Sequence, residues 1–268
     1  MRSLLLAAVL FAAAVDCQAA QELVTVPTRR SVTETYLLIR NPPSATPKVV
    51  VIAFVGGFGA IDLAALGGKG MPLKFGPTTN FLIRVRNELV DADFAEVVVD
   101  APSDKLPQGM SDEFRLGPDH LTDIRAVLAD VKKRFPDAKV FLMGTSRGTI
   151  STAALAATLG DTVQGTILTT TVTNRDKQGP GLSTFNFASI KIPVLLVHHR
   201  DDACPMSPYY NAERLSKSFP LVSVSGGDPP QSGPCDPQSP HGFLGEDAPV
   251  AQAMKSWMLG RDFPREIR

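Results

Sequence analysis

A serine flanked by glycines is the first candidate for chemistry in this sequence. Residues 144–148 read Gly-Thr-Ser-Arg-Gly, which places Ser146 in the pattern Gly-x-Ser-x-Gly. The apolar run at 139–143 predicts a strand before it, and the alanine-rich stretch at 149–159 predicts a helix after it. A sharp turn between a strand and a helix projects a serine hydroxyl above the sheet, and flanking glycines let the two elements approach closely. Ser146 is therefore the candidate nucleophile.

A serine hydroxyl needs a general base, and histidine is the side chain most often used. Of the four histidines, His120 lies near the start of a predicted helix and is expected to be structural or on the surface. His198 and His199 end a predicted strand. His241 lies in a loop between the last two predicted elements, a strand and a helix, which makes it the candidate base.

A carboxylate that orients the base and stabilises its charged form completes such a set. Asp201 and Asp202 lie just past the predicted strand at 193–197, and either could hold His241. The order along the chain is then serine, aspartate, histidine. The backbone N–H of Arg147, at the start of the helix after the serine, is a candidate donor to a developing oxyanion. Its side chain is expected to be exposed, with a surface or salt-bridged role.

The elements that must position these residues alternate along the chain. Continuous apolar runs predict buried strands, and apolar residues at helical spacing predict helices between them. Strands are predicted at 23–26, 31–39, 48–55, 95–99, 139–143, 166–172, 193–197 and 221–224, and helices at 81–90, 119–135, 149–159, 208–219 and 249–259. This alternation predicts an α/β protein with a mostly parallel sheet covered by helices on both faces, and ligands at the carboxyl ends of the strands.

With serine, acid and histidine in this order, the chain resembles the α/β-hydrolase family over roughly residues 30–260. It is further similar to secreted bacterial members with a His-His-x-x-Asp-x-Cys segment, here 198–204, and a later Cys before His-Gly-Phe, here 235–243. The resemblance implies an α/β-hydrolase fold and favours Asp202 as the acid. A more usual pattern in the family, an aspartate four residues before a proline, selects Asp201 because of Pro205.

The resemblance also bears on the second oxyanion donor, which in this family comes from the loop after an early strand. That loop often reads His-Gly-Gly, whereas residues 55–58 here read Val-Gly-Gly-Phe, without the histidine. Gly57 or Phe58 is the implied donor, and a simple glycine turn is the alternative interpretation.

The resemblance implies a serine hydrolase that needs no cofactor, and chain length bears on its substrate. Only 20 residues, 173–192, separate the two strands between which a cap would be inserted, so no large cap is expected. An open site favours a carboxylesterase acting on small or varied esters. A peptidase or amidase that uses the same residues and a non-catalytic binding protein of the same fold are the alternatives.

The N-terminus predicts export. Arg2, the apolar run at 4–15 and the small residues that follow are typical of a secretory signal peptide cleaved after Ala19 or Ala20. The run is too short to span a bilayer, so no membrane span is expected after cleavage. The mature chain, residues 20–268, is predicted to be a single domain that is secreted or periplasmic.

Cleavage of the signal peptide would remove Cys17 and leave two cysteines, Cys204 and Cys235. In an oxidising compartment these two are expected to form a disulfide, and two unrelated buried thiols are the alternative. The bond would join the loop after the candidate acid to the loop that carries His241. The chain-entropy account gives it about 3–4 kcal/mol of stability.

Composition excludes several other functions. The chain carries 27 Lys and Arg against 27 Asp and Glu, with no basic cluster, so it is not expected to bind nucleic acid. We find no metal-ligand spacing, no dinucleotide fingerprint and no phosphate loop, so neither a metal nor a cofactor is expected. The expected partner is a small-molecule ester or amide.

Overall fold

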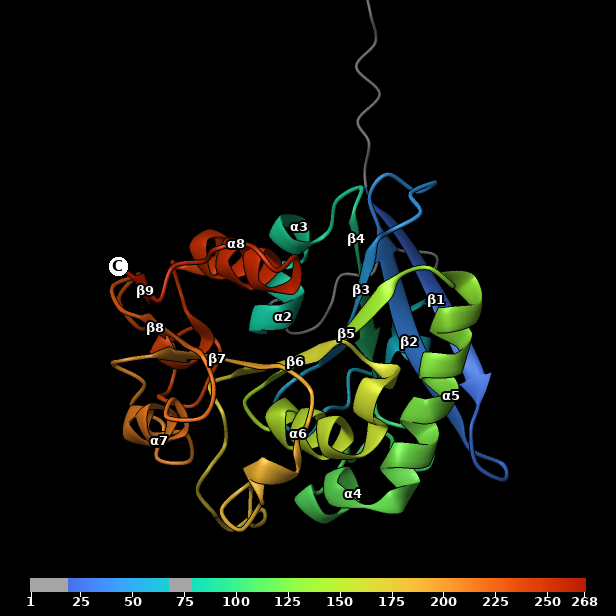
Figure 1. Ribbon diagram of the computed structural model, residues 1–268. Coiled ribbons are helices and arrows are strands. Elements are labelled where there is room, and N and C mark those ends of the chain that lie inside the picture. The colour runs from blue at the N-terminus through green and yellow to red at the C-terminus, as the bar shows by residue number, and fades with distance from the viewer. Residues whose placement is uncertain (1–18, 68–78) are drawn as a thin grey trace, which may run out of the picture.

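The structure is a computed structural model that describes residues 19–67 and 79–268 (Figure 1). Its strands form one sheet in the order β1-β2-β4-β3-β5-β6-β7-β8-β9. The strands are β1 Ala20–Pro27, β2 Thr33–Arg40, β3 Val49–Phe54, β4 Phe94–Val99, β5 Lys139–Thr145, β6 Gly165–Thr169, β7 Val194–His199, β8 Leu221–Val224 and β9 Glu266–Ile267. β1 and β2 are antiparallel to their neighbours, and every pairing from β4 to β9 is parallel.

Helices cover both faces of this sheet, as predicted. They are α1 Leu63–Gly67, α2 Phe81–Arg84, α3 Arg86–Leu89, α4 Asp112–Leu116, α5 Pro118–Arg134, α6 Gly148–Leu159, α7 Tyr209–Leu215 and α8 Asp247–Met258, with 3₁₀ turns η1 Gly160–Thr162, η2 Phe187–Ser189 and η3 Pro240–Gly242. In Figure 1, α2, α3 and α8 lie above the sheet and α4 to α7 lie below it. Two hydrophobic clusters, one on each face, form the core.

The burial of each strand follows its place in the sheet. Every residue of β3, β4, β6 and β7 is buried, as expected for parallel strands with helices on both sides. The edge strand β1 is only partly buried. Continuous apolar runs therefore predicted the central strands well.

The predicted helix at 81–90 is broken into α2 and α3. Asn80 caps α2 as its type suggests, because its Oδ1 accepts a hydrogen bond from the N–H of Leu82 at 3.1 Å. Phe81, Leu82 and Ile83 are all buried. The helix ends at Arg84, Val85 leaves helical geometry with ψ near 1°, and a new turn begins at Arg86.

The segment between β6 and β7 is a compact loop whose only helical element is the single turn η2, so the expectation of no large cap is confirmed. No helix within residues 19–67 and 79–268 has both the length and the apolar character needed to cross a membrane. Cys204 and Cys235 form the predicted disulfide, with their Cα atoms 4.7 Å apart. The predicted signal peptide lies outside the described residues except for Ala19, so export remains a prediction.

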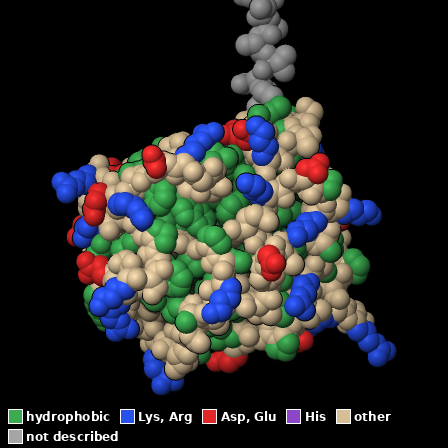
Figure 2. All heavy atoms as spheres, viewed as in Figure 1, with side chains coloured by type: hydrophobic (Ala, Val, Ile, Leu, Met, Phe, Trp, Pro, Cys, Tyr) green, Lys and Arg blue, Asp and Glu red, His purple; other side chains and the backbone are tan. Residues whose placement is uncertain are grey.

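Basic and acidic side chains are interspersed on the face of the molecule that Figure 2 shows. This agrees with the balanced charge of the sequence. All four histidines, in contrast, are buried. Any histidine that takes part in chemistry therefore lies inside the molecule, near the ends of the strands.

Candidate active site

Ser146 lies at the turn between β5 and α6, in the left-handed region of backbone space with φ +51°. A residue other than glycine held in such a conformation costs about 1–3 kcal/mol, so its surroundings must fix it. They do so through the backbone: the N–H of Ser146 donates to the carbonyl of Thr169 at 3.0 Å, and the carbonyl of Ser146 accepts from the N–H of Thr149 at 2.9 Å. The turn has the strained geometry that the sequence pattern predicts.

The glycines beside the serine are required by close packing. A Cβ atom on Gly144 would overlap the hydroxyl of Thr152, and one on Gly148 would overlap the carbonyl oxygen of Phe54. Gly56, from the loop after β3, lies on the other side of the serine, where its Cβ position is 3.1 Å from Cβ of Ser146. The backbone of that loop therefore passes directly beside the candidate nucleophile.

His241 and Asp202 form a buried pair. Nδ1 of His241 lies 3.0 Å from Oδ2 of Asp202, and the side chains are 4% and 0% exposed. Nδ1–H donating to the carboxylate leaves Nε2 as a free acceptor. Nε2 is buried and has no hydrogen-bond partner among the described residues. His241 and Ser146 line one small pocket of about 60 Å³ together with Gly56, Gly57, Phe81 and Pro237.

Further donors hold the Asp202 carboxylate. The N–H of Cys204 donates to Oδ1 at 2.9 Å, and the hydroxyl of Ser207 donates to Oδ2 at 3.0 Å while lying 3.1 Å from Nδ1 of His241. His198 places Nε2 3.3 Å from the same Oδ2. Burial by itself would raise the pKa of Asp202, but hydrogen bonds from His198 and His241 outweigh it and hold the pKa well below its usual range.

Ser207 and His198 were not identified as site residues from the sequence. The sequence placed His198 at the end of a strand and at the start of the segment 198–204, without a role in the site. Its Nε2 also lies 2.8 Å from the carbonyl oxygen of Ser207. The signal available was the position of His198 four residues before Asp202. Ser207 is an ordinary serine in a turn, and nothing in its sequence neighbourhood distinguishes it.

The structure does not bring Asp201 to His241. The Asp201 side chain is exposed, and the backbone N–H of Asp201 donates to Nδ1 of His199 at 3.0 Å. The Nε2 of His199 then donates to the carbonyl of Gly226 at 3.2 Å. Burial lowers the pKa of His199, so this histidine is a neutral structural group. Of the two candidate acids, Asp202 alone contacts His241.

Two buried side chains hold the loop between β3 and α1, residues 55–62. The buried guanidinium of Arg115 donates to the carbonyl of Gly57 at 3.1 Å and to the hydroxyl of Ser151 at 2.8 Å. The Asp100 carboxylate accepts from the N–H groups of Ile61 at 2.7 Å and Leu63 at 2.6 Å. This β3–α1 loop is thus ordered at both ends by buried ionisable side chains.

The two candidates for the second oxyanion donor lie differently. Gly57 lines the pocket beside Ser146 and has a left-handed backbone with φ +59°, which glycine adopts readily. Phe58 is 52% exposed, and its carbonyl accepts from the N–H of Met110 at 2.7 Å. The pocket lining thus includes Gly57 and does not include Phe58.

The salt-bridged role expected for Arg147 is confirmed, but the expectation that its side chain is exposed is wrong. Arg147 is buried, and its guanidinium forms ion pairs with Asp112 and Asp176. The other oxygen of Asp112 accepts from the N–H of Gly181 at 2.8 Å. Two carboxylates from α4 and from the β6–β7 loop compensate the buried charge, so the side chain fixes that loop and is not free for an acidic substrate group.

His120 is not on the surface either. It is buried between the rings of Phe54 and Phe114, and burial lowers its pKa to about 3, so it is a neutral core side chain. The structural role expected for His120 is present, and the surface position is wrong.

One group of possible metal ligands occurs among the described residues. Asp202, Cys204 and His241 each place a ligand atom within 4.8 Å of the others. The sulfur of Cys204 is bonded to Cys235 and cannot act as a thiolate, and Asp202 and His241 are hydrogen-bonded to each other. The donor set therefore does not fit a metal ion.

Comparisons with known proteins identify the fold. No family model and no curated protein match the sequence. Among solved structures, Est1E from Butyrivibrio proteoclasticus is 18% identical and matches with a TM-score of 0.59, covering 89% of this chain and 98% of its own. A dienelactone hydrolase from Anabaena variabilis is 17% identical, with a TM-score of 0.60, covering 91% of this chain and 99% of its own.

A third structure, XC6422 from Xanthomonas campestris, is described as an α/β serine hydrolase without lid. It is 16% identical, with a TM-score of 0.58, and covers 90% of this chain and 94% of its own. Likeness at this level of identity establishes the fold. The chain has the α/β-hydrolase fold, and the fold prediction is confirmed.

Proposed function

We propose that this protein is a serine hydrolase that cleaves carboxylic esters. The observation that carries the proposal is the buried Asp202–His241 pair: His241 lines the same pocket as Ser146 on its strained turn, and its Nε2 has no hydrogen-bond partner among the described residues. Such a set requires the acid to hold one ring nitrogen of the base and to leave the other ring nitrogen free to accept the serine proton.

The reaction follows from these positions. Nε2 of His241 takes the proton of Ser146 as Oγ attacks the ester carbonyl, and the imidazolium that forms is stabilised by ionised Asp202. His241 then returns the proton to the leaving alcohol, and the ester C–O bond breaks to give an acyl-serine. Water, activated by the same nitrogen, hydrolyses the acyl-enzyme and releases the carboxylic acid.

The oxyanion formed in each step needs donors that are already in place. The backbone N–H of Arg147, at the N-terminus of α6, and that of Gly57 are the proposed pair. The N–H of Gly57 shares a peptide unit with the carbonyl of Gly56, which accepts from the N–H of Gly59 at 3.3 Å, and Arg115 holds the carbonyl of the next peptide unit, between Gly57 and Phe58. These contacts support the assignment, because they order the turn before substrate binds.

The ester preference and the location of the protein belong to the same proposal. The short β6–β7 loop leaves the strand ends without a large cap, which favours small or varied esters. Two of the three solved structures described above are named as a dienelactone hydrolase and as a serine hydrolase without lid, and both are compatible with this activity. The disulfide supports export to an oxidising compartment.

The test is covalent labelling with a fluorophosphonate, which reacts with an activated serine. We expect one label per chain, on the peptide that contains Ser146, and none in Ser146→Ala. Folded wild-type protein that is not labelled would overturn the proposal and favour a non-catalytic binding protein. Hydrolysis of a p-nitrophenyl ester series, compared with aminoacyl-amides, then separates an esterase from a peptidase or amidase.

A further inference from the structure

An arginine far from His241 in the sequence holds the loop on which this histidine stands. Arg84 is the last residue of α2, and its Nη2 donates to the carbonyl of Gly242 at 2.6 Å across 158 sequence positions. Its Nη1 donates to the carbonyl of Pro237 at 3.2 Å and to that of Thr79 at 2.6 Å. We call residues 235–243 the histidine loop. Arg84 contacts this loop on both sides of His241.

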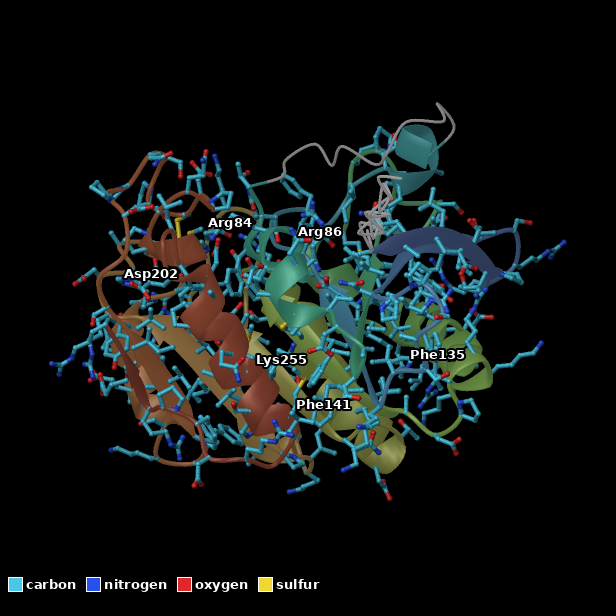
Figure 3. All side chains as sticks on the ribbon, turned by 90° about the horizontal axis from the view of Figure 1, so that it is seen from above. Arg84, Arg86, Phe135, Phe141, Asp202 and Lys255 are labelled. Atoms are coloured by element: carbon cyan, nitrogen blue, oxygen red, sulfur yellow. A yellow bond between two sulfur atoms is a disulfide. The ribbon has the colours of Figure 1, made fainter. Side chains whose placement is uncertain are left out.

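The same guanidinium is tied to α8. Its Nε and Nη2 donate to the two carboxylate oxygens of Asp247, each at 2.6 Å, in the parallel arrangement that arginine makes with a carboxylate. All five N–H donors of Arg84 are therefore used, three on backbone carbonyls and two on Asp247. Figure 3 shows Arg84 at the same end of the molecule as Asp202 and the disulfide drawn in yellow.

Aromatic packing continues the contact. The guanidinium carbon of Arg84 lies 5.9 Å from the centre of the Phe81 ring, and that ring lies 4.8 Å from the ring of Phe243, two residues after His241. Phe81 and Phe243 are buried, and Phe81 is a wall of the pocket beside Ser146. Arg84 thus connects the pocket wall, the histidine loop and α8.

The imidazole itself has few direct restraints. Its Nδ1 contacts Asp202 and Ser207, and its Nε2 has no partner among the described residues. The direction of Nε2 therefore depends on the backbone that carries the ring. A shift of about 1 Å in a catalytic group can reduce the rate about 100-fold. Arg84 sets this backbone by fixing the carbonyls of Pro237 and Gly242.

We propose that Arg84 is a positioning residue for the base: it fixes the histidine loop so that Nε2 of His241 points at Ser146. This inference rests on the function proposed above. It assigns to Arg84 a contribution to the rate of the chemical step in addition to any contribution to stability.

Arg29 offers a matched control for a purely structural role. Its side chain is 17% exposed, close to the 19% of Arg84, and it likewise donates to both oxygens of one carboxylate, that of Asp123, at 2.9 Å. Arg29 lies in the turn between β1 and β2 and contacts none of the pocket residues. Arg29 pairs with three carboxylates, those of Asp104, Asp119 and Asp123, and Arg84 pairs with one, so loss of Arg29 removes at least as many ion pairs.

The experiment compares Arg84→Met, Arg84→Lys, Arg29→Met and wild type in thermal unfolding and in hydrolysis of p-nitrophenyl acetate. We expect both Met variants to unfold at lower temperature. In Arg84→Met we expect kcat to fall about 100-fold with KM changed less than about threefold, because loop position affects the transition state more than binding. Arg29→Met keeps the wild-type kcat. Arg84→Lys keeps a cation beside Asp247 but loses the fork, so it recovers stability without recovering kcat.

Chemical rescue separates positioning from folding. Methylguanidinium added to Arg84→Ala can occupy the vacated site and bridge Asp247 to the two carbonyls, and we expect it to restore part of kcat. It should not restore kcat in Ser146→Ala. A folded Arg84→Lys with wild-type kcat, or Arg29→Met with an equal loss of kcat, would overturn the proposal.

A second readout does not depend on turnover. The proton between Nδ1 of His241 and Asp202 gives a low-field imidazole signal in proton NMR. We expect this signal to shift or broaden in Arg84→Lys and to be unchanged in Arg29→Lys. If wild type proves inactive and unlabelled, the proposed hydrolase fails, while an unchanged signal in Arg84→Lys counts separately against the loop-positioning role.

Discussion

Two loops meet at Ser146, and each is held by an arginine in a different way. Arg84 at the histidine loop is partly exposed and pairs with both oxygens of Asp247. Arg115 behind the β3–α1 loop is wholly buried, and within the described residues no carboxylate oxygen lies within 4.0 Å of it. Burial accordingly lowers the pKa of Arg115 to about 10, although the charge of Asp112 opposes this.

The difference reflects what each loop must supply. The histidine loop follows a long stretch rich in glycine and proline, and it must aim a side chain, so it is tied at several points and by a disulfide. The β3–α1 loop leaves directly from a central strand and must present only backbone N–H groups. Backbone hydrogen bonds within and next to the loop, and one side-chain hydrogen bond from Arg115 to the carbonyl of Gly57, order that backbone, with Asp100 at the far end.

The largest effect is expected from the acid that the histidine loop faces. Asp202→Asn keeps the size of the side chain but removes the charge that fixes the tautomer of His241, so kcat should fall about 10⁴-fold. Asp201→Asn is the matched control and should keep the wild-type kcat, because its side chain is exposed. Steady-state kinetics on one ester measure both. Equal losses in the two variants would contradict the geometry.

A smaller effect is expected on the side of the β3–α1 loop. Arg115→Met removes the hydrogen bond to the carbonyl of Gly57, in the peptide unit next to the one that carries the Gly57 N–H, and so loosens the turn that presents this donor. Complete loss of an oxyanion donor costs about 10²–10³ in kcat. We expect a loss of kcat of about 10–100-fold, below that bound. The melting temperature should fall less than in Arg84→Met. No carboxylate among the described residues pairs with Arg115, so none is left unpaired when its charge is removed. A larger thermal effect for Arg115→Met would reverse the comparison.

The disulfide should affect stability more than rate. Removing it in Cys204→Ser/Cys235→Ser frees a crosslink that spans 31 positions and should lower the free energy of unfolding by about 3–4 kcal/mol. The five hydrogen bonds of Arg84 remain, so kcat below the melting temperature should change only a few-fold. Denaturant unfolding and kinetics on the same samples measure the two effects. A collapse of kcat in folded protein would show that the disulfide, and not Arg84, positions the histidine loop.

The smallest effect concerns pH. The pKa of Asp202 is lowered in the folded state, so this group adds stability above the unfolded pKa of about 3.9, and that stability is lost as pH falls below it. The difference in unfolding free energy between wild type and Asp202→Asn should therefore shrink between pH 6 and pH 3. For Asp201→Asn the difference should stay nearly constant. Urea unfolding at several pH values tests the contrast.

The sequence was most informative where the signal is local. Ser146 was identified because a glycine-flanked turn between strand and helix has a recognisable pattern, and the packing of Gly144 and Gly148 explains why. The central strands were equally clear, since both of their faces are buried. The helix at 81–90 was only partly right, because Val85 interrupts it between α2 and α3, and no local sequence signal marks that break.

Polar contacts between residues far apart in the chain could not be predicted from sequence patterns. Arg147 was expected to be exposed, yet Asp112 and Asp176 compensate its charge inside the protein. Neither partner has a sequence relation to Arg147 that a pattern could reveal. The contact of Arg84 with Gly242 is of the same kind, since a backbone carbonyl accepts from any donor regardless of the residue that carries it.

By itself the sequence determined the order of β1 to β8 and of the longer helices, the candidate nucleophile and base, and the pair of cysteines, whereas α1, α4 and β9 were not predicted. Periodicity, glycine and cysteine act locally or by count, so they can be read without coordinates. Only the tertiary structure distinguished Asp201 from Asp202, because Asp201 is exposed and Asp202 is buried against His241. It also decided which arginines hold the two loops, because a buried charge is defined by partners that the fold brings together.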